Sequence, residues 1–112
     1  MPSFESPRTR LTALARQDYF AAIRWYKQQS SESVAERFVL EVEQTLERIR
    51  RSPLIFPVAA RGRRKALLKV FPFQIIFVKV ENVLVIVAIM HNSRDPSYWQ
   101  GRLLPSEDIN PN

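Results

Sequence analysis

The spacing of apolar residues predicts two helices in the first half of the chain. Apolar residues recur at helical intervals over residues 13–29, and Thr12 is suited to cap the start of this segment. A second and cleaner stripe begins after a cap at Ser31 or Ser33 and continues to about Arg51. Because only a short polar turn separates the two segments, they predict a helical hairpin.

The pattern changes to that of β-strands in the second half. Runs of strand-forming residues over 64–71, 73–80 and 83–90 predict three strands. The last two are joined by Glu81-Asn82, a connection of hairpin length. The run 73–80 is mostly apolar on both faces and is predicted to be central. Residues 8–12 suggest a further, short strand at an edge.

Neither the helices nor the strands can bury their apolar faces alone. The arrangement that buries both is a two-layer α+β domain, in which the helical hairpin packs on one face of an antiparallel sheet of three to four strands. The length of 112 residues is that of a single domain, taken here as residues 1–112. Residues 1–8 and 104–112 are expected to be loosely ordered.

The composition limits which partners the protein is expected to bind and which kinds of site it can form. The net charge of +6 favours acidic partners such as nucleic acid or an acidic protein. With no cysteine and one histidine the chain cannot build a disulfide or a zinc site, and we expect neither a metal nor a cofactor. No apolar run reaches the roughly 18 residues that span a bilayer. The N-terminus lacks the apolar segment of a signal peptide, so a cytoplasmic protein without membrane contact is expected.

The end of the last predicted strand gathers the groups best suited to chemistry. His91 and Arg94 follow the strand directly, and Tyr98 and Trp99 come soon after. A histidine can exchange a proton near neutral pH, and an arginine can stabilise charge on a phosphate, so these two are the candidates for metal-free RNA cleavage. The alternative is structural: His91 closes the strand, and Arg94 pairs with Asp95 or with the helices. Because no carboxylate is evident as a base, no catalytic residue is assigned.

Two further groups are candidates for binding. A basic cluster over residues 61–65, with Lys69 beyond it, suits either a phosphate or acidic partner or a merely solvated loop. Phe20 and Trp25 lie off the apolar stripe of their helix and are expected to be half exposed, where they either pack locally or meet a partner helix.

In order and spacing, these segments resemble the ParE branch of the RelE/ParE toxin superfamily. The similarity covers about residues 10–102 and is carried by ARQDY at 15–19, WY at 25–26, ERF at 36–38, SP at 52–53, RRKALL at 63–68, FPF at 71–73 and IMHNSRDP at 89–96. Members are small, basic, cytoplasmic toxins of type II toxin–antitoxin modules, also associated with plasmid stabilisation. The resemblance therefore implies a cognate, ParD-like antitoxin that neutralises the toxin in a hetero-oligomer.

The resemblance also implies a target. ParE members are associated with poisoning DNA gyrase, whereas RelE members cut messenger RNA in the ribosomal A site. His91 matches the strand-end position of the RelE-like group, but Asn92 and Ser93 stand where further catalytic groups are expected. The chain is therefore interpreted as a growth inhibitor that binds gyrase rather than as an enzyme. A ribosome-dependent ribonuclease using His91 and Arg94 is the first alternative, and a non-toxic member that only binds antitoxin is the second.

Two sets of contact residues follow from this interpretation. The residues expected to contact the target are Arg63, Arg64, His91, Arg94 and Trp99. The residues expected to contact the antitoxin are Phe20, Trp25, Arg61 and Lys65. Nucleic acid contact is treated as possible but secondary.

Overall fold

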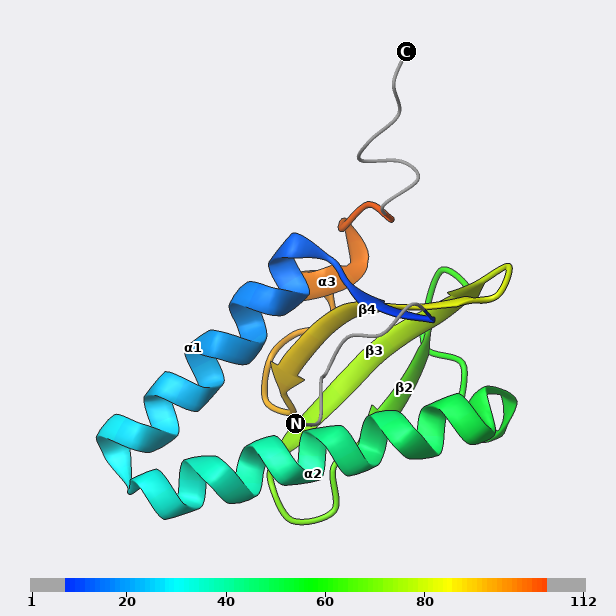
Figure 1. Cartoon of the computed structure of the whole chain (residues 1–112). Helices are drawn as coiled ribbons and strands as arrows, with labels where there is room; N and C mark the ends of the chain where they lie inside the picture. The colour runs from blue at the N-terminus through cyan, green and yellow to red at the C-terminus, as the bar shows by residue number, and fades with distance from the viewer. Residues whose placement is uncertain (1–7, 105–112) are drawn as a thin grey trace.

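The computed structural model describes residues 8–104, which form two helices on one face of a four-stranded sheet (Figure 1). The elements are β1 (Thr9–Leu11), α1 (Ala13–Gln29), α2 (Glu32–Arg51), η1 (Pro53–Ile55), β2 (Arg64–Leu67), β3 (Phe73–Val80), β4 (Val83–His91) and α3 (Ser97–Gln100). The strand order is β1-β4-β3-β2. The predicted two-layer α+β class is confirmed.

Both long helices begin at the side-chain caps that the sequence suggests. The hydroxyl of Thr12 accepts a hydrogen bond from the Ala15 N–H at 3.1 Å, and so satisfies one of the free donors at the start of α1. At the start of α2 the cap is Ser31, which accepts from the Val34 N–H at 3.1 Å. Of the two predicted caps, Ser33 is therefore not used.

The sheet is mixed, which corrects the expectation of a purely antiparallel sheet. β2, β3 and β4 are antiparallel neighbours, but β1 runs parallel to β4. The parallel pair ends where Leu11 lies opposite Ile86, because the chain turns there into α1. From Val87 onward, β1 no longer pairs with that edge of β4.

The first strand of the second half is shorter than predicted. β2 ends at Leu67 rather than near Phe71, and the loop that follows is bound to Glu41 of α2. Its carboxylate accepts backbone hydrogen bonds from Lys69, Val70 and Phe71, the bond from Val70 measuring 3.0 Å. A carboxylate that receives several N–H groups is strongly held, so this contact fixes the loop to the helix layer.

Replacing Glu41 with alanine is expected to lower the free energy of unfolding by about 1–3 kcal/mol, the range for lost hydrogen bonds to a charged group. Urea unfolding followed by circular dichroism measures the loss. Glu36 of the same helix is exposed, and Glu36→Ala is the matched control, with a change below about 0.5 kcal/mol. Equal stability of the two variants would show that Glu41 does not anchor the loop.

The apolar core has two parts, one on each face of the sheet. The larger part lies between the helices and the sheet and includes Tyr19, Phe38 and Ile75. The smaller part lies on the opposite face, where Trp99 of α3 packs with Val87 and other residues of the sheet. β4 is therefore covered on both faces, which explains why residues 84–90 are all buried.

Candidate functional site

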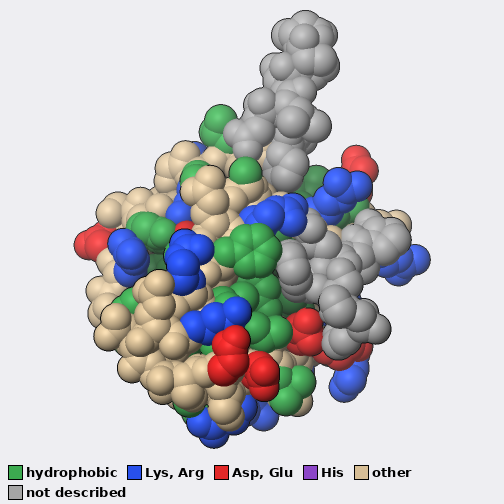
Figure 2. All heavy atoms as spheres, turned by 60° about the vertical axis from the view of Figure 1, so that its left-hand side comes forward, with side chains coloured by type: hydrophobic (Ala, Val, Ile, Leu, Met, Phe, Trp, Pro, Cys, Tyr) green, Lys and Arg blue, Asp and Glu red, His purple; other side chains and the backbone are tan. Residues whose placement is uncertain are grey.

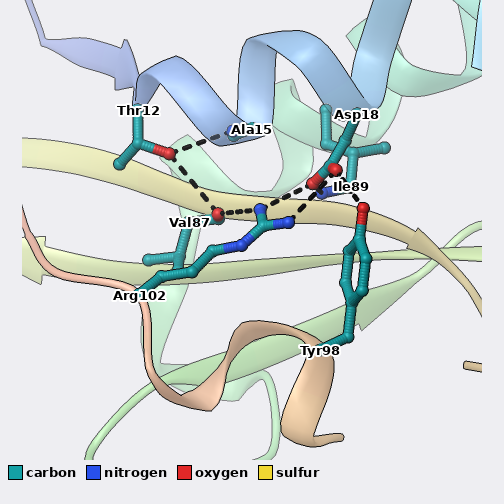
Figure 3. A network of polar contacts seen from close by, with 7 residues as sticks. All are labelled: Thr12, Ala15, Asp18, Val87, Ile89, Tyr98 and Arg102. Atoms are coloured by element: carbon teal, nitrogen blue, oxygen red, sulfur yellow. Dashed lines mark hydrogen bonds and ion pairs between the residues drawn. The ribbon is translucent and has the colours of Figure 1, made fainter. Parts of the chain in front are cut away.

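A buried network of polar side chains ties α1 to β4 and to the segment after α3 (Figure 3). Asp18 of α1 pairs with Arg102: its Oδ2 lies 2.7 Å from Nη1, and its Oδ1 accepts from Nη2 at 3.2 Å. Oδ1 also accepts from the Tyr98 hydroxyl at 2.6 Å. The side chains of Asp18 and Arg102 are only 5% and 9% exposed, so the ion pair is shielded from water.

The same network satisfies the edge of β4 that β1 leaves unpaired. Asp18 accepts a hydrogen bond from the Ile89 N–H at 3.1 Å. The carbonyl of Val87 accepts from Arg102 Nη1 at 2.9 Å and from the Thr12 hydroxyl at 3.4 Å. Side chains thus replace a strand partner, because buried backbone groups must find hydrogen bonds. The consequence is a fixed position for the end of β4.

Tyr98 is held by charges above its ring and at its hydroxyl. The guanidinium carbons of Arg94 and Arg102 lie 4.4 and 4.6 Å from the ring centroid, within cation–π range. Burial, and then the hydrogen bond to Asp18, raise the pKa of Tyr98 above its usual value. Its hydroxyl donates to Asp18 and is therefore not free to act as a base.

His91 is engaged by its own loop. Its Nδ1 accepts from the Ser93 N–H at 3.1 Å and lies 2.8 Å from the Ser93 hydroxyl, while its ring packs edge-on against Phe73. The neighbouring Asp95 accepts from the Ser97 N–H at 2.8 Å, and this bond lowers the pKa of the Asp95 carboxyl. Within residues 8–104, no carboxylate is hydrogen-bonded to His91. The structure gives Arg94 a ring contact with Tyr98 rather than the ion pair with Asp95 considered from the sequence.

A groove of about 730 Å³ runs between α1 and the end of β4. Its apolar wall comes from α1, where Leu14 and Trp25 are 46% and 56% exposed. Its other side is formed by His91, Arg94 and the polar network. The groove thus combines an apolar wall with basic side chains, a combination suited to an amphipathic, acidic segment.

Comparison with known proteins identifies the family. The sequence model of the ParE toxin of the type II toxin–antitoxin system, parDE, matches residues 9–96. The chain belongs to this family. Among solved structures, a chromosomal ParDE system from P. aeruginosa has a similar fold, with a TM-score of 0.66 at 19% identity over 74% of this chain and 92% of that chain. No curated protein sequence matches significantly.

The family identifies the chain as the toxin component of such a system, and the system includes an antitoxin partner. Residues 8–104 contain no helix that is long and apolar enough to cross a membrane. They also contain no cluster of acidic residues and histidine able to hold a metal ion.

The structure brings together only part of the predicted target surface of this toxin. His91 and Arg94 both line the groove. Arg94 also lines a second hollow, of about 420 Å³, on the opposite face of the sheet, together with Lys65, which is predicted as an antitoxin contact. Arg64 lies elsewhere: it is opposite Phe77, whereas His91 is opposite Phe73, about 13 Å away along β3 at ~3.3 Å per residue.

Two of the predicted target contacts are buried, which corrects their assignment. Trp99 is 3% exposed because it fills the core beneath α3. Arg63 is 8% exposed and donates to the carbonyls of Arg61 and Arg102, at 3.0 and 3.4 Å. Both side chains therefore offer little surface for direct contact with a target, although Trp99 borders the second hollow.

The predicted antitoxin contacts are accessible but do not form one patch. Phe20 and Trp25 are 44% and 56% exposed, as expected from their position off the stripe. Trp25 lines the groove, whereas Phe20 stacks on Tyr19 with ring centroids 6.0 Å apart. Arg61 is exposed in the turn before β2, away from the residues that line the groove. Figure 2 shows apolar side chains exposed between basic ones on the face it turns forward.

The sequence interpretation missed Asp18 and Arg102, the centre of the network. A signal was present for Asp18, which lies three residues after Ala15 and four before Ala22, both buried. A carboxylate in line with the apolar stripe of a helix needs a buried partner. Nothing in the sequence indicated that the partner is 84 residues away.

Proposed function

We propose that this toxin inhibits DNA gyrase by binding it, in the cytoplasm, and is neutralised by a ParD-like antitoxin. The observation that supports the proposal is that three acid–base groups near the end of β4 are already engaged in hydrogen bonds: the Asp18 carboxylate, the Tyr98 hydroxyl and Nδ1 of His91. Asp18 is paired with Arg102, the Tyr98 hydroxyl donates to Asp18, and His91 Nδ1 accepts from Ser93. General acid–base cleavage of RNA needs a positioned base, and none of these three groups is free to serve as one.

The target contact is proposed to centre on Arg94, with His91 beside it. Arg94 is exposed, and its guanidinium is oriented over the ring of Tyr98, which is itself fixed to Asp18. An arginine held in this way loses little conformational freedom on binding. Nucleic acid held by gyrase is a secondary contact, because a phosphate would also suit these cations.

The antitoxin is proposed to place an amphipathic segment in the groove against Leu14 and Trp25. The net charge of +6 would speed the approach of an acidic antitoxin. Phe20 would extend this contact along α1, and Arg61 and Lys65 would bind acidic residues beyond it. The product would be a toxin–antitoxin hetero-oligomer without metal or cofactor.

The test is a supercoiling assay with purified gyrase, together with detection of trapped cleavage complexes. The wild-type toxin should inhibit supercoiling, and Arg94→Ala should raise the toxin concentration needed by about tenfold or more, as for a central arginine of an interface. Arg37 is exposed on α2, and Arg37→Ala is the matched control.

Three results would contradict the proposal. Gyrase that remains fully active at high toxin concentration would exclude it as the target. Cleavage of ribosome-bound message, detected by primer extension and abolished by His91→Ala, would establish the ribonuclease instead. Normal growth on induction, combined with tight antitoxin binding, would identify a non-toxic member.

A further inference from the structure

The turn after α2 holds apolar side chains out in solvent. Leu54 and Ile55 of η1 are 74% and 75% exposed, and we call this pair the apolar knob. Neither residue lines the groove or belongs to the polar network. In Figure 1 the turn lies at the end of α2 that is far from α1 and from the loop after β4. The knob is therefore separate from the surfaces described above.

The backbone that carries the knob is fixed by its neighbours. Phe56, the next residue, is 7% exposed and packs edge-on against Phe77 with centroids 5.8 Å apart. Arg64 Nη1 donates to the carbonyl of Phe56 at 2.6 Å and reaches that of Leu54 at 3.5 Å. Exposed apolar side chains on a fixed backbone are preorganised for burial in a partner, because little entropy is lost when they bind.

The surroundings of the knob are basic. The last turn of α2 carries Arg48, Arg50 and Arg51, and the side chain of Arg51 is 73% exposed. Glu47 offsets part of this charge, with ion pairs of 3.1 Å to Arg50 and 3.8 Å to Arg51. The complement of such a surface is an apolar pocket with an acidic rim.

We propose that the apolar knob docks into an apolar, acid-rimmed pocket on the protein target of the toxin. This inference rests on the proposed function, in which the toxin acts by binding. A second copy of the chain does not fit, because contact between two knobs would bring together the basic residues in the last turns of both α2 helices. The antitoxin is assigned to the groove near α1. The knob therefore gives the target a second contact, at the end of α2 and separate from the contact at Arg94.

The experiment compares wild-type toxin with the double variant Leu54→Ser/Ile55→Ser, using purified gyrase as the probe. Both positions are largely exposed, so the variant should fold, as circular dichroism and urea unfolding will verify. The toxin concentration needed for half inhibition should rise at least tenfold, while affinity for the cognate antitoxin stays within twofold. Leu40 is 53% exposed on α2, and Leu40→Ser is the matched control, expected to inhibit like the wild type.

The outcomes separate this inference from the proposed function. Unchanged inhibition of gyrase by the double variant would overturn the inference, and so would a loss of antitoxin affinity of tenfold or more. If wild-type toxin leaves gyrase active, the proposed target fails, and growth arrest on induction becomes the readout. If the double variant no longer arrests growth but still binds the antitoxin, the knob docks into a protein target other than gyrase. Growth arrest that persists in the double variant would overturn the inference.

Discussion

Replacing Asp18 with alanine is expected to lower the free energy of unfolding by about 3–5 kcal/mol, the range for removing one partner of a buried ion pair. The loss is large because Arg102 would keep its charge in a site where it is 9% exposed. The Ile89 N–H and the Tyr98 hydroxyl would lose their acceptor as well. Such a loss is a large fraction of the stability of a typical small domain. Urea unfolding followed by tryptophan fluorescence measures it.

Two variants separate the ion pair from other effects of the substitution. In Asp18→Leu/Arg102→Met both charges are replaced by apolar side chains of similar size, so the part of the loss that is due to the unpaired charge should return. The Ile89 N–H and the Tyr98 hydroxyl still lack their acceptor, so the stability should stay below that of the wild type. Glu36→Ala removes an exposed carboxylate from α2 and should change stability by less than about 0.5 kcal/mol. A loss below about 1 kcal/mol for Asp18→Ala, the range of an exposed pair, would show that the network is not structural.

The elements that the sequence predicts well are those specified by local patterns. Both long helices and two of the three main strands lie close to the predicted bounds, because apolar periodicity and capping residues act over a few positions. The errors arise from distant contacts. The loop that follows β2 is bound to Glu41, which is 28 to 30 residues from the backbone groups it binds. The parallel pairing of β1 depends on β4, far along the chain.

The structure places some of the predicted site residues at the groove and buries others. The end of β4 does border the groove, and His91 and Arg94 do lie there. Trp99 was expected at the surface, yet the uncharged run that forms β4 already indicated that both faces of this strand are covered. Trp99 supplies part of the cover on the second face, and this explains its burial. Which segment covers that face is a tertiary property that no local pattern specifies.

Replacing Phe38 with alanine is expected to cost about 3–5 kcal/mol of the free energy of unfolding, as for large core side chains. Phe38 is fully buried, and its ring centroid lies 5.2 Å from that of Tyr26 and 5.1 Å from that of Phe73. The substitution removes the ring that joins α2 to α1 and to β3, and leaves a cavity between the layers. Urea unfolding measures the effect, with Phe20→Ala as the matched control. Because Phe20 is 44% exposed, that variant should lose clearly less stability. Equal losses would contradict the assignment of Phe38 to the centre of the core.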